Sequence, residues 1–224
     1  MSSLQVPCCL TDEPGTPRIK LCGLTHPEDV AAVNALRPDY AGFVFAPGRR
    51  RVSADTARDL IAGLAASIVP VGVFVNEVPE TIARIVRMCG LGVVQLHGAE
   101  EEAQVAALRA LLPTGTAIWK ALRVKDAASL APLAALPADR FLLDAWHPEQ
   151  AGGTGEAFDW RILEGVTVPF LLAGGLNAGN VEGAIRLVRP WGVDVSSGVE
   201  TCGRKDPERM AAFVAAVRGM ETVR

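Results

Sequence analysis

Residues 169–198 read PFLLAGGLNAGNVEGAIRLVRPWGVDVSSG and contain one complete structural repeat. An apolar run at 169–173 ends in two glycines, a helical segment follows, and a second run at 192–195 ends in Ser-Ser-Gly. Asn177 can cap the helix, which must end before Pro190 because proline cannot continue it. The pattern predicts a strand, a helix and a parallel strand.

The same unit recurs in both directions from this stretch. Eight short runs, most of them continuously apolar as in strands covered on both faces, are spaced roughly 20 to 30 residues apart. They are 19–22, 40–45, 69–75, 92–96, 117–121, 141–144, 169–173 and 192–195. Eight such units in 224 residues predict one closed (β/α)8 TIM barrel in the α/β class. Glycine-rich turns come only after the last three runs, which argues against a Rossmann dinucleotide site.

Helix signals lie between the runs. The segment 25–28, THPE, has capping-box spacing, and Asp206 precedes a proline at a first helical position. A third helix is predicted between Pro79 and Gly90. Residues 1–17 are interpreted as an N-terminal extension, and 18–224 as the catalytic barrel.

Composition excludes several classes of protein. The formal net charge is −3, and no long basic stretch suits a nucleic-acid backbone. No apolar run reaches the roughly 18 residues of a membrane helix, and the chain does not begin like a signal peptide. Five cysteines without repeated spacing predict no disulfide framework and no metal site, so a reducing cytoplasm is expected.

Polar residues interrupt or follow the apolar runs, where barrel enzymes carry their chemistry. They are Lys20, Cys22, Gln95, His97, Lys120, Asp144, Asp194 and Ser196. Lys20 and Cys22 share one strand face, so the ammonium is expected to lower the thiol pKa. Structural roles stay open: Lys20 can simply pair with Asp194, His97 can be a hydrogen-bonded barrel histidine, and Asp144 an ion-pair partner.

Three glycine-rich loops follow the last three runs. Their expected phosphate-binding residues are Gly153, Gly155, Gly174, Gly175, Ser196, Ser197 and Gly198. Glycine lets backbone N–H groups approach an anion, and the last two loops of a TIM barrel commonly bind phosphate. Residues 197–200 can form the short helix that often faces it. Tight turns without a ligand remain the alternative.

Nine motifs together resemble, in order, those of the phosphoribosylanthranilate isomerase family. They are KLCGLT at 20–25, GFVFAP at 42–47, GVFVN at 72–76, VQLHG at 94–98, LD at 143–144, GGTG at 152–155, FDW at 158–160, LAGGL at 172–176 and DVSSGVE at 194–200. The resemblance implies an Amadori rearrangement in tryptophan biosynthesis, from N-(5-phosphoribosyl)anthranilate to 1-(2-carboxyphenylamino)-1-deoxyribulose 5-phosphate, without metal or organic cofactor.

The resemblance also implies roles for individual residues. Cys22 matches the family's general base and Asp144 its general acid. Arg50 matches the arginine that binds the substrate carboxylate, although GRRRV at 48–52 departs from the family pattern, so that Arg49 or Arg51 can take its place. Lys20, Gln95, His97 and Asp194 are expected around the same pocket.

Two other functions share part of this set of residues. A related barrel acts on a histidine-pathway aminoaldose, or on both substrates, but relies on an aspartate where this chain has Cys22. A non-catalytic phosphosugar-binding barrel would need the glycine loops but not the pair of Cys22 and Asp144. The expected ligand is a small phosphorylated molecule, and both a monomer and a homodimer are compatible with the sequence.

Overall fold

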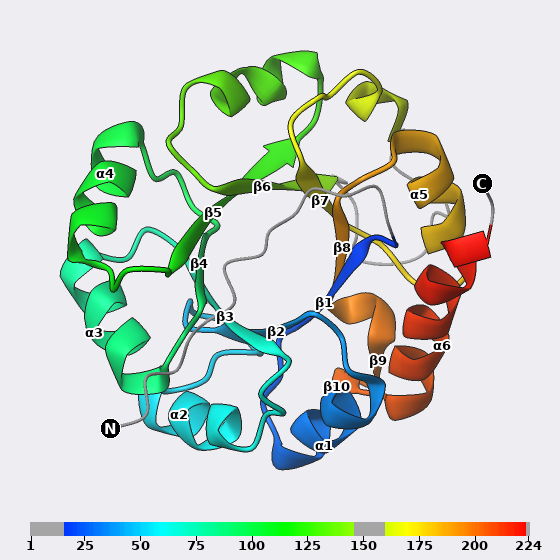
Figure 1. Cartoon of the computed structure of the whole chain (residues 1–224), viewed down its shortest axis with the longest axis horizontal. Helices are drawn as coiled ribbons and strands as arrows, with labels where there is room; N and C mark the ends of the chain where they lie inside the picture. The colour runs from blue at the N-terminus through cyan, green and yellow to red at the C-terminus, as the bar shows by residue number, and fades with distance from the viewer. Residues whose placement is uncertain (1–15, 146–159, 223–224) are drawn as a thin grey trace.

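A computed structural model describes residues 16–145 and 160–222. Eight parallel strands form a closed barrel in chain order, and β1 pairs with both β2 and β8 (Figure 1). The strands are β1 (Arg18–Cys22), β2 (Tyr40–Val44), β3 (Val69–Phe74), β4 (Val93–Leu96), β5 (Ala117–Val124), β6 (Arg140–Ala145), β7 (Phe170–Ala173) and β8 (Gly192–Val195). The predicted TIM barrel is confirmed.

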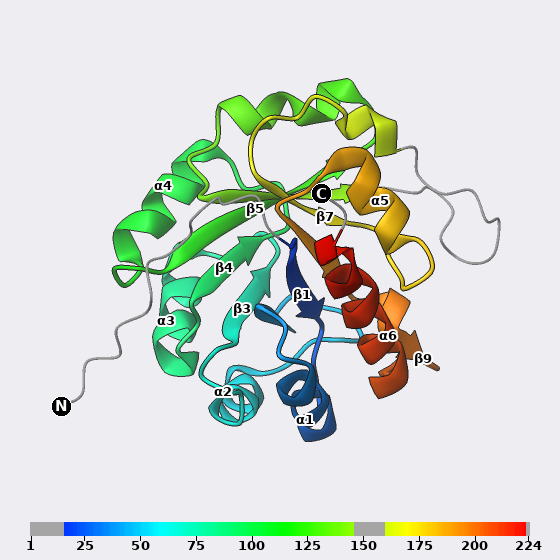
Figure 2. The same ribbon diagram turned by 45° about the vertical axis from the view of Figure 1, so that its right-hand side comes forward.

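Helices surround the ring of strands (Figure 1). The α-helices are α1 (Pro27–Leu36), α2 (Ala54–Ala62), α3 (Pro79–Cys89), α4 (Glu102–Leu111), α5 (Val181–Val188) and α6 (Pro207–Arg218). Short 3₁₀ helices are η1 (Ala127–Ala134), η2 (Trp160–Leu163), η3 (Ser197–Val199) and η4 (Gly219–Thr222). A small antiparallel hairpin, β9 (Glu200–Thr201) and β10 (Arg204–Lys205), follows η3. Figure 2 shows β9 beside the first turns of α6.

Local signals explain most helix ends. Asp206 caps α6 by accepting hydrogen bonds from two backbone N–H groups of the first turn, as predicted. Gly90 ends α3 in the left-handed conformation, with φ 67°. The structure has two helix N-caps at other residues than predicted. Because Pro27 occupies the first position of α1, the cap is His26 and not Thr25, and α5 begins after Asn180 and not Asn177.

The core has two parts. A large aliphatic cluster lies between strands and helices, and a smaller one fills the barrel interior around Trp119, whose ring packs edge-on against Tyr40 at 4.8 Å between centroids.

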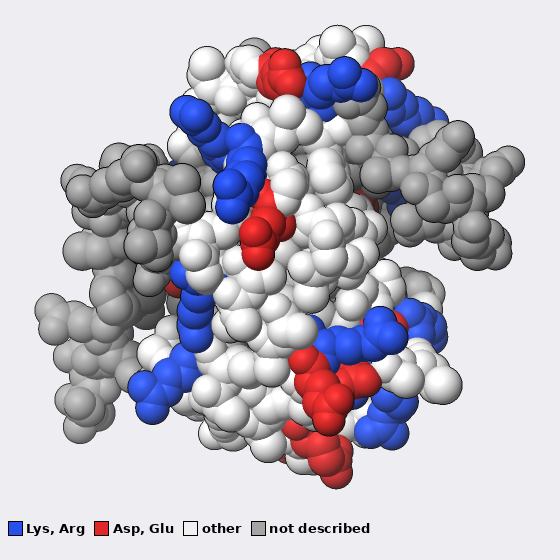
Figure 3. Space-filling view, turned by 90° about the vertical axis from the view of Figure 1, so that its right-hand side faces the viewer, with Lys and Arg blue, Asp and Glu red and all other residues white. Residues whose placement is uncertain are grey.

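On the face that carries α5 and α6, Figure 3 shows acidic and basic side chains interspersed among the described residues. No helix within 16–145 or 160–222 has the length and apolar character needed to cross a bilayer.

Candidate active site

A cavity of about 540 Å³ opens where the strands end. Eleven of the predicted site residues line it: Cys22, Arg50, Gln95, His97, Asp144, Gly174, Gly175, Asp194, Ser196, Ser197 and Gly198. The predicted Gly153 and Gly155, and residues 1–15 of the extension, lie outside the described residues. Cys22 is the last residue of β1, and Asp144 lies near the end of β6. Both therefore face a common cavity, although β7 and β8 separate their strands around the ring.

Lys20 lies beneath Cys22 and is fully buried. Its Nζ donates to Oδ1 of Asp194 at 2.8 Å, across the junction between β1 and β8. Burial alone would lower the pKa of the Lys20 ammonium, but the charge of Asp194 outweighs it with help from Cys22, so the pKa is raised. The predicted pairing of Lys20 with Asp194 is confirmed, and the lysine stays charged inside the barrel.

The Cys22 thiol differs from expectation. Burial raises its pKa, Lys20 opposes this, and Asp194 raises it again, so the net shift is upward. Lys20 does lower the thiol pKa, as predicted, but the expected net downward shift of the Cys22 pKa was wrong. The physical reason is that Asp194 compensates the ammonium charge while the sulfur itself is nearly inaccessible to water.

Gly42 makes room for the sulfur. It is the β2 partner of Cys22, and a Cβ at this position would lie 2.7 Å from the Cys22 Sγ. Any side chain here would have to displace the thiol. The glycine of the GFVFAP motif thus has a steric role beside the reactive group.

Asp144 belongs to a chain of polar side chains. Its Oδ2 lies 3.2 Å from Nε2 of His97, whose Nδ1 lies 3.1 Å from Nε2 of Gln95. Gln95 is almost completely buried, whereas His97 and Asp144 are partly exposed toward the cavity. The three residues, from β4, its following loop and β6, form one hydrogen-bonded network.

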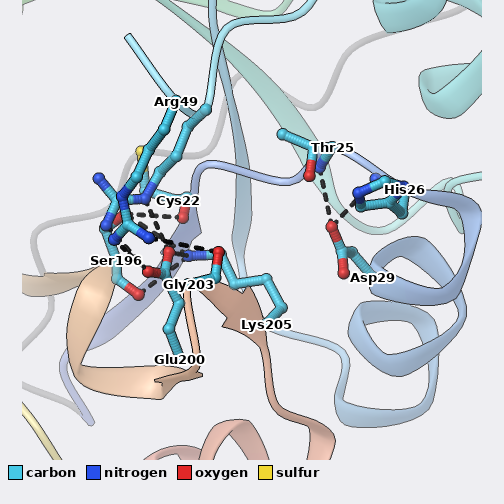
Figure 4. Close-up of polar contacts among 10 residues, drawn as sticks. Cys22, Thr25, His26, Asp29, Arg49, Ser196, Glu200, Gly203 and Lys205 are labelled. Carbon is cyan, nitrogen blue, oxygen red and sulfur yellow. Dashed lines mark hydrogen bonds and ion pairs between the residues drawn. The ribbon is translucent and has the colours of Figure 1, made fainter.

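The arginines after β2 are joined to the hairpin after β8. Figure 4 shows Arg49, Ser196, Glu200 and Lys205 gathered beside Cys22. Arg50 Nε and Nη2 donate to the two Glu200 oxygens at 2.7 and 3.0 Å, and Arg49 also pairs with Glu200. Burial would raise the pKa of the Glu200 carboxyl, but Arg50 and Lys205 lower it to about 2. Arg49 and Arg50 line the cavity.

Ser196 links the loop after β8 to β1. Its hydroxyl donates to the backbone carbonyl of Cys22 at 3.1 Å, and Lys205 Nζ donates to the Ser196 carbonyl at 2.9 Å. A Cβ at Gly198 would lie 1.8 Å from the Leu176 carbonyl oxygen. The loops after β7 and β8 therefore touch at Gly198, a residue without a side chain. The predicted short helix at 197–200 is present as η3, which begins at Ser197 and ends one residue early, at Val199.

Three charged residues near the cavity were not predicted. Arg123 lines the cavity because β5 continues to Val124, beyond the expected end at 121. The sequence signal that could have indicated this residue is a second charge, after Lys120, in an otherwise apolar strand. Glu200 and Lys205 lie in a hairpin with no apolar run to indicate it. Lys120, expected to end β5, is instead inside the strand and pairs with buried Glu100 at 2.9 Å.

The comparisons with known proteins agree with this geometry. A family model described as N-(5'-phosphoribosyl)anthranilate (PRA) isomerase matches residues 19–216. The chain belongs to this family. A PRA isomerase of Acetivibrio thermocellus is 48% identical over 207 residues, covering 89% of this chain and 95% of the relative.

Solved structures of PRA isomerases have the same barrel. One is in complex with reduced 1-(o-carboxyphenylamino)-1-deoxyribulose 5-phosphate, with TM-score 0.78, 32% identity and coverage of 91% of this chain and 100% of the other. A second contains monomers generated from the dimeric enzyme of Thermotoga maritima, with TM-score 0.79, 33% identity and the same coverage. Within the described residues, no three His, Cys, Asp or Glu side chains gather in a metal-binding arrangement.

Proposed function

We propose that this PRA isomerase uses Cys22 as general base and Asp144 as general acid in the Amadori rearrangement of N-(5-phosphoribosyl)anthranilate, a step of tryptophan biosynthesis. The observation that carries the proposal is that both side chains line one cavity, from strands on different sides of the ring. The reaction needs a proton donor and a proton acceptor on opposite sides of the ribose, and a carboxyl group and a thiol can take these two roles.

The first step is ring opening. Asp144 donates its proton to the furanose ring oxygen, the bond from that oxygen to C1 breaks, and the anthranilate nitrogen forms a double bond to C1. The resulting Schiff base is cationic. His97, at 3.2 Å from Asp144, supports this step because it can orient the carboxyl group.

The second step is proton removal from C2. The Cys22 thiolate takes this proton, the electron pair of the broken C2–H bond makes the C1–C2 bond double, and the pair of the C1=N double bond returns to the nitrogen. The enolamine then gains a proton at C1 and loses one from the C2 hydroxyl, which gives the ketone. Because burial holds the thiol pKa above its usual value, only a minor thiolate fraction reacts near neutral pH.

The substrate's anionic ends have separate partners in the proposal. Gly174, Gly175 and the segment 196–198 bind the phosphate, which the close contact of the two loops supports. Arg50 binds the anthranilate carboxylate. Arg49 is the second choice because it also lines the cavity, whereas Arg51 is exposed outside it.

The test compares Cys22→Ala and Asp144→Asn with the parent in an assay of substrate consumption. Each variant should lose roughly 10²–10⁴-fold in kcat, the usual contribution of a general acid or base, while still binding the reduced product analogue. Cys89→Ala is the matched control, since this thiol donates to the Ala54 carbonyl away from the cavity. Parent-like activity in Cys22→Ala would refute the assignment.

Two aspects of the proposal need separate measurements. Turnover of the histidine-pathway aminoaldose by the parent would indicate a dual-specificity enzyme. A monomer or a homodimer remains the expected assembly, to be measured by light scattering. The free thiols at Cys22, Cys89 and Cys202 support a reducing compartment such as the cytoplasm.

A further inference from the structure

Glu200 accepts hydrogen bonds from three cations. Its Oε1 accepts from Arg50 Nε at 2.7 Å and from Lys205 Nζ at 2.8 Å, and its Oε2 from Arg50 Nη2 at 3.0 Å and from Arg49. A carboxylate has about four acceptor positions, so these contacts fill them. The side chain is only 6% exposed. Glu200 is therefore saturated by its neighbours and is not itself a ligand-binding group.

These contacts occupy one particular edge of the Arg50 guanidinium. Nε and Nη2 form its side edge, which leaves both Nη1 protons and the second Nη2 proton unused by Glu200. The free edge formed by Nη1 and Nη2 can donate two parallel hydrogen bonds to another carboxylate. Because Arg50 lines the cavity and is 25% exposed, this edge is accessible to a ligand there.

The rest of the cluster holds this arrangement in place. Lys205 is 2% exposed, and its Nζ joins Glu200 to the Ser196 carbonyl. The β9–β10 pairing places Lys205 opposite Glu200. On the other side, the Arg50 stem crosses Gly23, where a Cβ would lie 2.5 Å from the Arg50 Cδ. Arg50 is thus confined between the hairpin and the residue that follows Cys22.

The charges of the cluster still favour an anion. Arg49, Arg50 and Lys205 carry three positive charges, and Glu200 neutralises one of them. Two positive charges remain beside the cavity, partly shielded from water. A second carboxylate is therefore attracted even though the first one is already bound.

We propose that Glu200 is a positioning residue that, held by Lys205, fixes the side edge of Arg50 so that its free edge captures the ortho carboxylate of the substrate. This inference rests on the proposed function. It adds the β9–β10 hairpin to the parts of the protein that determine recognition of the substrate carboxylate. Glu200 acts only through Arg50. Its loss should therefore affect ligands that have the carboxylate and spare ligands that lack it.

The test measures Glu200→Gln with two probes, the reduced product analogue and the same compound without its carboxyl group. Glutamine offers one acceptor oxygen, and its NH₂ group faces the arginine donors, so the side edge is released. The dissociation constant of the carboxylated probe should rise about tenfold or more, as expected for loss of a well-aligned charged contact. The dissociation constant of the decarboxylated probe should change less than about threefold.

Asp206→Asn is the matched control. Asp206 follows the same hairpin and caps α6, so its loss perturbs local stability without touching Arg50. It should leave the ratio of the two dissociation constants unchanged. Equal weakening of both probes by Glu200→Gln would overturn the inference, while the proposed function would fail separately if the parent did not convert the aminoaldose.

Discussion

The buried pair of Lys20 and Asp194 gives the strongest stability prediction. Lys20 is 0% exposed and Asp194 10%, with 2.8 Å between Nζ and Oδ1. Removing one partner of a buried pair leaves an uncompensated charge and typically costs about 3–5 kcal/mol. Asp194→Asn should reach this range because Lys20 has no access to water. Lys20→Met should cost less, since the Asp194 carboxylate borders the cavity.

The measurement is urea unfolding of the parent, both single variants and the double variant at neutral pH. Asp194→Asn should lower the free energy of unfolding by about 3–5 kcal/mol, and a thermal scan should show the same loss as a fall of roughly 10 °C in the melting temperature for a domain of this size. The double variant should be more stable than Asp194→Asn, because replacing both charges removes the unpaired one. A change below about 1 kcal/mol in Asp194→Asn, or a double variant less stable than it, would refute the reasoning.

Three further outcomes follow from the geometry. Gly198→Ala should cost about 2 kcal/mol or more and weaken phosphate-dependent binding, because its Cβ meets a carbonyl oxygen at 1.8 Å; denaturation and a phosphate titration measure both. Gly42→Ala should lower kcat with a smaller effect on KM, because it displaces the Cys22 sulfur; an unchanged kcat would contradict this. Glu200, whose pKa falls from 4.5 to about 2 on folding, stabilises the protein above its unfolded pKa. Parent stability should thus fall as pH drops from about 4.5 toward 2, and less steeply in Glu200→Gln.

The barrel could be predicted because its signals are local and repeated. Each apolar run and each Gly or Pro punctuation requires only its own neighbourhood, and the closed sheet then follows from counting units. The strand ends were less certain: β5 extends three residues beyond its apolar run, so Arg123 was overlooked at the cavity. A charged residue at the exposed end of a strand is compatible with the strand, but it ends the apolar pattern from which the last strand residue is predicted.

The site was predictable in membership but not in electrostatics. Cys22 and Asp144 were recognised from motif positions, and both line the cavity. The direction of the Cys22 pKa shift depends on a competition between burial, Lys20 and Asp194, and the last of these is remote in sequence. The role of Glu200 was not predicted for the same reason, since its arginine partners lie about 150 residues away in the sequence.

The contact between the first and last strands has a consequence for synthesis of the chain. Lys20 emerges early from the ribosome, while its counterion lies 174 positions later. Until β8 docks, a buried ammonium has no partner, so an incomplete barrel disfavours closing around it. The surroundings of Cys22 therefore form only when the C-terminal segment arrives. Truncated or nascent chains that lack it should keep a solvated lysine and an ordinary thiol, and remain catalytically silent until the barrel is sealed.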